Sequence, residues 1–324
     1  MKDFLNRREV VGLAGAAGVA ALGGCAGGAN SSGFQADGGV KLPPGRAAGE
    51  LEAVELATGV KLISGAGSNV LAVAGPEGAL LVDGGLAQHA PGLVQRALAE
   101  TGTKKIARLI NTHWHPEATG ANELLGPKGT PILAHENTRL WMGTEITSRW
   151  QDKVYSPRAL KARPSESFYT TKEIALGSET IQCGYLLQAH TDGNIYVRLR
   201  NANIIAAGGV LSAKGWPLID WQTGGWIGGM VRGIETLIAQ TDDSTIIVPA
   251  DGPPLKRQDL IKQREMYVTI MGRLKTMMES GFSADKVVAG APAKEFEAER
   301  GDASEFLRLA FRSFWGHVRQ FDVV

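Results

Sequence analysis

Two histidines separated by a single residue, shortly after an apolar run, are the feature that most constrains this chain. His113 and His115 follow the run at residues 106–110. If that run is a β-strand, side chains two positions apart point the same way, so both imidazoles can reach one ion. A third histidine, His190, also comes after an apolar stretch, at residues 185–187. Three imidazoles that leave a fourth position open are typical of a catalytic zinc site.

These residues resemble the signature of the metallo-β-lactamase fold superfamily, His-x-His-x-Asp-His followed by a downstream His-Thr-x-Gly segment. His113, His115 and His190 match its histidines in the right order, and the resemblance covers residues from about 59 to 255. It implies a fold of the α/β (α+β) class, a four-layer αββα sandwich with the metal in the cleft between two sheets. It also implies that these three histidines are the metal ligands.

The rest of the signature departs from the family. Glu117 stands where the family has Asp, and Ala118 where it has the next His. Gly209 replaces an Asp that bridges two metals in many relatives, and Asp251 replaces the last His. Alanine and glycine side chains cannot bind a metal, so the sequence favours one zinc ion. Glu117 and Asp251 remain as carboxylates that could hold a weaker second ion, of the Mg or Mn kind.

Three carboxylates are candidates for supporting roles. Glu117 is close enough to His115 to act as a general base on a metal-bound water. Asp251 is predicted to hydrogen-bond a ligand histidine or a water. Asp83 matches a family Asp that supports the site from behind the ligands. The alternatives are surface or capping carboxylates for Glu117 and Asp251, and a turn-forming residue before glycines for Asp83.

The N-terminus predicts export. Residues 1–25 combine a basic start, paired arginines at Arg7 and Arg8, and an apolar stretch at residues 10–22 that is short for a membrane span. The paired arginines resemble a twin-arginine signal, although valines follow where bulkier residues are usual. Cys25 ends a lipoprotein-like box, which predicts a lipid anchor and a periplasmic location; the alternative is a simple cleavage site. Residues 26–50, rich in Gly, Ala, Ser and Pro, are predicted to be a flexible tether.

Composition narrows the class of protein. The chain has 324 residues, 44% of them hydrophobic and 21% charged, with a net charge of +1. This composition is typical of a globular protein and gives no electrostatic case for a nucleic-acid partner. A small-molecule substrate is the expected partner, besides the membrane at Cys25. Cys183 is the only other cysteine, and its apolar surroundings predict a buried structural thiol.

One metallo-β-lactamase-like domain is predicted for residues 51–324, with C-terminal helices from about residue 255 onward. Strands are predicted at residues 60–63, 69–74, 79–82, 105–110, 131–134, 174–176, 180–187, 195–199, 203–207 and 245–248. Helices are predicted at residues 88–100, 119–125, 136–149, 225–240, 255–279, 293–299 and 304–320. The polar stretch at residues 151–167 has no clear period and is predicted to be a loop or lid across the site.

Tryptophans gather near the expected cleft. Trp114 lies between two ligands, and Trp216, Trp221 and Trp226 follow the late strand region. They predict either an aromatic wall for an apolar or ring-bearing substrate, or packing within the core.

The sequence therefore predicts an exported hydrolase of an ester, thioester, lactone or amide. Its nucleophile would be a hydroxide on one zinc ion. The alternative is a non-catalytic binding protein on the same fold, because Ala118 and Gly209 stand where the family has metal ligands, as expected of an active site that has lost its function. The sequence does not indicate an oligomeric state.

Overall fold

The computed structural model describes residues 48–317, all within one compact unit. The predicted signal at residues 1–25, including Cys25, and most of the predicted tether lie outside the described residues. Within residues 48–317, no helix has the length and apolar character needed to cross a membrane.

Seven strands form the first sheet, and they lie in the sheet in chain order. They are β1 (Ala48–Ala57), β2 (Val60–Ala66), β3 (Val70–Val73), β4 (Ala79–Val82), β5 (Ile106–Ile110), β6 (Ile132–His135) and β9 (Glu166–Phe168). The pairs from β1 to β4 are antiparallel, and β4, β5, β6 and β9 run parallel. Helix α1 (Ala90–Thr101) covers the outer face, where Leu93 and Ala97 are fully buried against the sheet. The short helices α2 (Pro116–Thr119) and α3 (Asn122–Leu125) follow β5.

Five strands form the second sheet. They are β10 (Thr171–Leu176), β11 (Glu179–Tyr185), β12 (Ile195–Leu199), β13 (Ile204–Gly208) and β14 (Ile246–Pro249). All neighbours are antiparallel except β13 and β14, which run parallel because helix α5 (Ile227–Ala239) connects them. Helix α6 (Arg257–Glu279) packs beside α5. The chain continues through α7 (Ala284–Ala289), α8 (Glu297–Arg300) and α9 (Ser304–Ser313).

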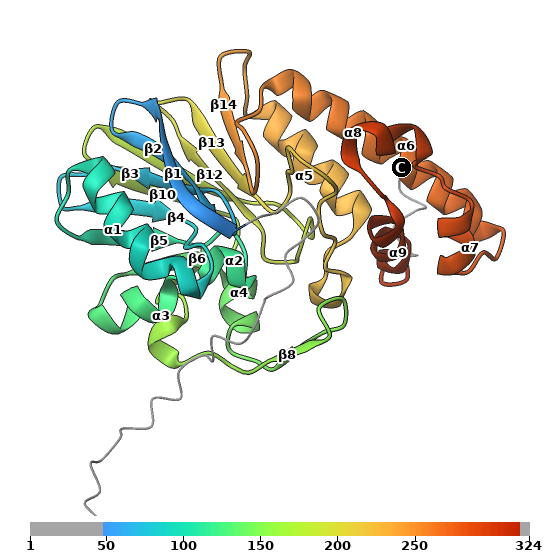
Figure 1. Ribbon diagram of the computed structural model, residues 1–324, viewed down its shortest axis with the longest axis horizontal. Helices are drawn as coiled ribbons and strands as arrows, with labels where there is room; N and C mark the ends of the chain where they lie inside the picture. Colours follow the sequence, from blue (N-terminus) through green and yellow to red (C-terminus); the bar gives the residue numbers. More distant parts are fainter. Residues whose placement is uncertain (1–47, 318–324) are drawn as a thin grey trace, which may run out of the picture. The chain divides into compact units, whose positions relative to one another are not determined.

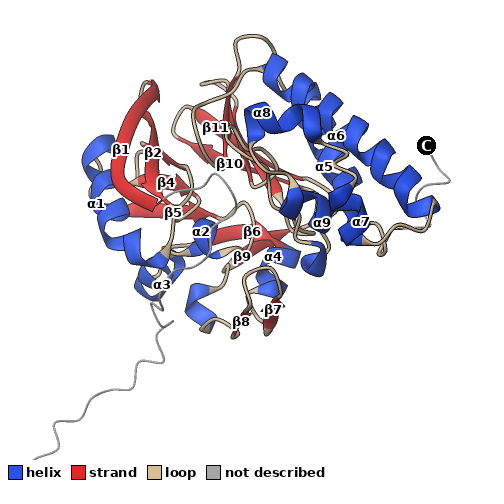
Figure 2. Ribbon diagram, turned by 45° about the vertical axis from the view of Figure 1, so that its right-hand side comes forward, coloured by secondary structure: helices blue, strands red, loops and turns tan. Residues whose placement is uncertain are grey.

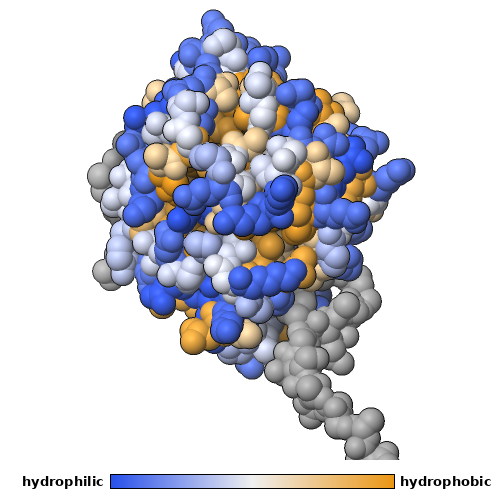
Figure 3. Space-filling view, turned by 90° about the vertical axis from the view of Figure 1, so that its left-hand side faces the viewer, coloured by the Kyte–Doolittle hydropathy of each residue, from blue (hydrophilic) through white to orange (hydrophobic). Residues whose placement is uncertain are grey.

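The two sheets face each other across one apolar core. Val82 and Ile110 of the first sheet pack there with Val197 and Ile204 of the second. Burial of each such side chain contributes roughly 1.5–3 kcal/mol. With α1 outside one sheet and α5 and α6 outside the other, the layers run helix, sheet, sheet, helix (Figure 1). The predicted αββα sandwich is confirmed. Seen from the side of the first sheet, the surface is largely hydrophilic with smaller apolar groups between (Figure 3).

One predicted helix is wrong over much of its length. In place of the helix expected at residues 136–149, the structure has the shorter helix α4 (Glu136–Trp141). A two-stranded hairpin of β7 (Ile146–Ser148) and β8 (Lys153–Tyr155) follows it (Figure 2). Gly143 and the β-branched residues after it disfavour continued helix, because glycine costs backbone entropy and β-branched side chains lose χ1 freedom there. The predicted loop at residues 151–167 contains β8 and the start of β9. Strand β1 and helix α7 were not predicted.

Candidate metal centre

The three histidines come together where strands of both sheets end. His113 and His115 follow β5, and His190 lies in the loop between β11 and β12. Each is at most 2% exposed. Their candidate ligand nitrogens all lie within 4.8 Å of one another, and their ring centres are 4.7–5.0 Å apart. Among residues 48–317, no other group of three or more His, Cys, Asp or Glu side chains converges in this way.

A chain of hydrogen bonds fixes the tautomer of His113. The backbone N–H of Thr112 donates to one oxygen of Asp83 (2.8 Å), and the Thr112 hydroxyl donates to the other (2.8 Å). That hydroxyl has given its only hydrogen to Asp83, so it can only accept from His113 Nδ1, 2.9 Å away. Nδ1 of His113 therefore carries the proton, and Nε2 keeps the lone pair that a metal needs.

Asp83 occupies a backbone conformation that few residues other than glycine adopt. Its φ is +66°, and its N–H donates to Ile110 O at the end of β5. This geometry places both of its carboxylate oxygens against Thr112. Asp83 thus reaches His113 through one intervening side chain, which fits the supporting position expected from the sequence.

His115 is oriented by a carboxylate that sequence reasoning missed. Its Nε2 lies 3.0 Å from Asp220 Oδ2, and the Thr223 hydroxyl also donates to that oxygen (2.6 Å). A charged acceptor at Nε2 favours a proton there, so Nδ1 is the nitrogen left for a metal. Burial lowers the pKa of His115, but Asp220 and Glu117 together outweigh it and raise that pKa to about 9 in the metal-free site. Below that pH the ring carries both protons, and a metal ion would displace the proton on Nδ1. The only sequence signal was a lone Asp within an aromatic segment.

Glu117 is buried in the first turn of α2 and faces two of the histidines. Its Oε1 lies 3.7 Å from His113 Nε2 and 3.6 Å from His115 Nδ1, the two nitrogens that the hydrogen bonds leave for a metal. Its main-chain oxygen accepts the hydroxyl of Ser68. Only 1% exposed, Glu117 is not a surface carboxylate. Its position is compatible with a metal ligand or with a base beside the metal.

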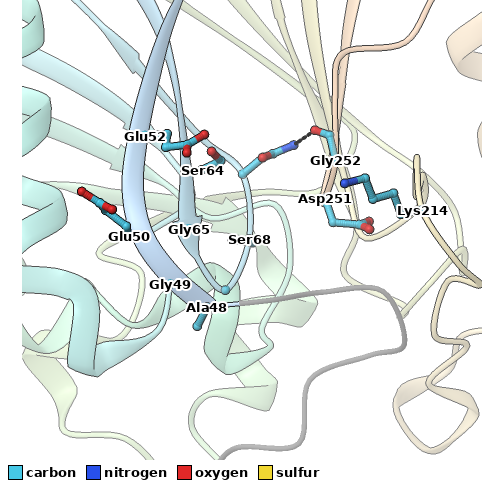
Figure 4. Close-up of a pocket in the computed structure, with 12 residues that line it drawn as sticks. Ala48, Gly49, Glu50, Glu52, Ser64, Gly65, Ser68, Lys214, Asp251 and Gly252 are labelled. Carbon is cyan, nitrogen blue, oxygen red and sulfur yellow. Dashed lines mark hydrogen bonds between the residues drawn. The ribbon is translucent and has the colours of Figure 1, made fainter.

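Asp251 lies in a neighbouring pocket. The Ser212 hydroxyl donates to its Oδ2 (3.1 Å), and the converging group of ligand atoms does not include it. The pocket, of about 260 Å³, also has Ser68, Asn69 and Lys214 in its wall (Figure 4). Since Ser68 bonds Glu117, the pocket adjoins the metal centre. A hydrogen bond from Asp251 to a ligand histidine stays a prediction.

The tryptophans divide between the site and the core. The indole N–H of Trp114 donates to Thr223 Oγ1 (3.1 Å), and its ring meets Tyr155 of the β7–β8 hairpin edge to face at 5.6 Å. Trp216 instead stacks on Phe306 in the core behind the second sheet. Trp114 therefore lies beside His115 together with Tyr155, whereas Trp216 follows the packing interpretation; an aromatic wall for a substrate stays a prediction.

Comparisons with known proteins agree with this geometry. The sequence model of the metallo-beta-lactamase superfamily matches residues 64–249, more than half of the chain. The chain belongs to this superfamily. No curated protein matches the sequence. Among solved structures, a metallo-beta-lactamase from Pontibacter korlensis is similar with a TM-score of 0.54 and 20% identity, over 67% of this chain and 99% of that one.

Two further structures are similar in fold. DIM-1 metallo-beta-lactamase gives a TM-score of 0.54 and 17% identity, over 68% of this chain and 98% of its own. The inverting sec-alkylsulfatase Pisa1 from Pseudomonas sp. gives 0.63 and 14%, over 82% of this chain and 50% of its own. These identities support the fold alone. Relatives with this fold are hydrolases, which supports hydrolase chemistry for the chain at the level of the superfamily.

The donor set suits a metal ion. Three buried imidazoles converge, and the hydrogen bonds made by His113 and His115 leave one nitrogen of each for coordination. Such nitrogen donors suit zinc and several other transition metals, so the geometry supports metal binding without selecting the element.

Proposed function

We propose that this protein is an exported hydrolase of an ester, thioester, lactone or amide. It would work with one zinc ion held by His113 Nε2, His115 Nδ1 and His190. The observation that carries the proposal is the convergence of these three buried rings, with Glu117 Oε1 3.7 Å from His113 Nε2 and 3.6 Å from His115 Nδ1. A bound zinc ion would polarise a carbonyl group and lower the pKa of a water molecule.

The chain's own side chains would perform the proton transfer and the positioning. Glu117 is the base that holds a proton at Oε1, next to the reacting atoms. Asp83 and Asp220 keep the rings of His113 and His115 in the required tautomers. Trp114 and Tyr155 form an aromatic edge beside His115, which favours a substrate with an apolar portion.

The test begins with the zinc content of the purified mature protein, with His113→Ala as the control. About one zinc per chain, lost in the control, is expected. Turnover is then screened with an aryl ester, a thioester, a lactone and a β-lactam. A secondary alkyl sulfate completes the panel, because one structural neighbour is named as an alkylsulfatase. His190→Ala should abolish both zinc binding and turnover, and retained turnover in that variant would overturn the proposal.

Glu117→Gln separates the hydrolase from a binding protein. It keeps the shape of the side chain but removes the base, so turnover should fall by roughly 10²–10⁴-fold. A variant with unchanged turnover would remove Glu117 from the chemistry. If the parent protein hydrolyses nothing in the panel but binds a member of it equally well with either residue, the chain is a binding protein.

We further propose that Cys25 is lipidated after export through the twin-arginine route and anchors the protein in the periplasm. The support is the N-terminal sequence alone. In a bacterial host, Cys25→Ala should shift the protein from the membrane fraction to the soluble periplasmic fraction. Replacement of both Arg7 and Arg8 by Lys should retain the protein in the cytoplasm. An unaltered membrane fraction in Cys25→Ala would refute the lipid anchor.

A further inference from the structure

The ring of His190 packs directly against the main chain of Gly209. A Cβ atom at position 209 would lie 2.5 Å from Nδ1, 2.6 Å from Cε1 and 2.8 Å from Cγ of His190. Favourable separations between non-bonded carbon atoms are about 3.5–4.0 Å. The imidazole therefore occupies the space in which any side chain at residue 209 would begin.

The main chain of His190 is also tightly held. It is fully buried, and its carbonyl oxygen accepts the N–H of Asp220 (2.9 Å). A Cβ atom at Gly225 would lie 2.2 Å from the same oxygen, so the loop that carries Asp220 is already in close contact with His190. A displaced ring would also leave the convergence with His113.

The main chain at Gly209 is equally confined. The preceding residue, Gly208, ends β13 with φ +53°, a conformation that glycine adopts readily. A Cβ atom at Gly208 would lie 2.4 Å from Thr112 Oγ1, the hydroxyl that accepts from His113. The glycine pair thus contacts one ligand, His190, and the residue that supports another, His113, so a shift of the backbone would disturb one or the other.

We propose that Gly209 is a positioning residue of the three-histidine centre, and that its contact with His190 limits this centre to one metal ion. A ligand side chain at position 209 and a converged His190 ring exclude each other in this chain. The glycine is therefore a requirement of the first metal site rather than an empty place in a second one. This inference rests on the proposed function for its metal, a single zinc-like divalent ion.

Zinc binding by the purified protein tests the inference, through competition with a chromophoric chelator and atomic emission for stoichiometry. Gly209→Ala should weaken binding of Zn²⁺ by at least about tenfold, because it displaces one of three ligands. Gly209→Asp should bind zinc more weakly than the parent and still hold at most one ion per chain. Gly272→Ala is the control, since a Cβ atom at Gly272 on α6 meets nothing within 4 Å.

A second measurement covers the loss of stability that such a clash would cause. Thermal unfolding in EDTA compares Gly209→Ala alone with Gly209→Ala in a His190→Ala background. Removal of the ring opens the space, so the drop in melting temperature caused by Gly209→Ala should largely vanish in that background. An equal drop in both backgrounds would show that the ring is not what confines position 209.

The inference would be overturned if Gly209→Asp bound two zinc ions, the first as tightly as the parent protein binds its one. It would also be overturned if Gly209→Ala bound zinc as tightly as the parent. These experiments measure zinc binding and thermal stability rather than turnover, so their outcome is independent of the test of hydrolysis. A parent protein that binds one zinc and hydrolyses nothing would contradict the proposed activity and leave the role of Gly209 standing.

Discussion

At the scale of single residues, Asp220 is the side chain on which the orientation of His115 depends. Asp220→Ala removes the acceptor from His115 Nε2 and from the Thr223 hydroxyl, both buried. Loss of such a partner typically costs 10–100-fold in metal affinity. We expect a decrease of that size in Zn²⁺ affinity, measured by chelator competition. Asp243→Ala, at an exposed aspartate, should leave the affinity unchanged.

Asp220→Asn gives a finer version of the same comparison. The amide keeps an oxygen that can accept from His115 but loses the negative charge, so its effect should lie between those of the parent and of Asp220→Ala. Equal zinc affinity in all three proteins would show that the ring of His115 is held by packing alone.

Cys183 supplies a pH-dependent prediction. Burial raises the pKa of its thiol from an ordinary value near 9 to about 12. Between these values the unfolded chain releases the thiol proton while the folded chain retains it. The free energy of unfolding should therefore fall as pH rises above about 9, by up to about 1.4 kcal/mol per pH unit from this group.

Urea unfolding at pH 8.5 and pH 9.5 measures this effect below the ordinary pKa of tyrosine, which is about 10. Cys183→Ala should reduce the loss of stability between the two pH values. In a Cys25→Ser protein at pH 8, the Cys183 thiol should react with a thiol reagent only after unfolding. Rapid reaction of the native protein would contradict the burial of this thiol.

Site residues that are close together in the sequence could be predicted, whereas those that only the fold brings together could not. His113 and His115 were predictable because strand geometry alone places residues two apart on one side. The aspartate that holds His115 is 105 positions away in the chain and becomes its neighbour only through the fold. The space beside Gly209 is occupied by the ring of His190, which lies on another loop. The sequence therefore showed the glycine but not the contact that excludes a side chain there.

At the scale of elements, Gln222 links the β7–β8 hairpin to the loop beside the metal centre. Gln222 accepts from the N–H of Arg149 (2.8 Å) and donates to Thr147 O (2.8 Å). Both bonds are exposed and together stabilise the hairpin position by about 1 kcal/mol, since net contributions of this size are usual. Gln222→Ala should therefore speed amide hydrogen exchange at residues 146–155 by roughly fivefold.

Gln240→Ala is the matched control, because Gln240 bonds Arg198 at the end of α5 and lies outside the hairpin and its loop. Exchange in β12 should be unaffected by Gln222→Ala. Unchanged exchange at residues 146–155 would mean that Tyr155 against Trp114, rather than Gln222, holds the hairpin.

Elements with strong periodicity were predictable, and the short ones were not. The strand around Leu81 is a continuous, fully buried apolar run, and the strand around Leu109 is apolar at every position except Arg108, so composition identifies both. Strand β1 alternates between exposed and half-buried residues at the sheet edge and carries little apolar signal. The hairpin has only three residues per strand, too few to establish a period, and its pairing depends on the turn between the strands.

At the scale of the whole molecule, the C-terminal helices complete the core behind the second sheet. Phe306 of α9 is 3% exposed, stacks on Trp216 and approaches Tyr267 of α6. The same apolar cluster includes Ile234 of α5. The helices that follow the residues matched by the family model are therefore packed as part of the second half of the sandwich.

Phe306→Ala tests this arrangement. Truncation of a buried phenylalanine leaves a cavity and typically costs 3–5 kcal/mol. We expect a loss of that size in the free energy of unfolding, measured in urea, with one cooperative transition and an unchanged dependence on urea concentration. Phe282→Ala, at a phenylalanine with 38% exposure, should cost far less.

A separate early transition for residues after 255, with the remainder unfolding as in the parent, would show instead that these helices form an independent unit. A single transition would mean that the metal site at His190 and the packing of Phe306 belong to one folding equilibrium. Added zinc should then raise the unfolding midpoint of both the parent and Phe306→Ala by mass action.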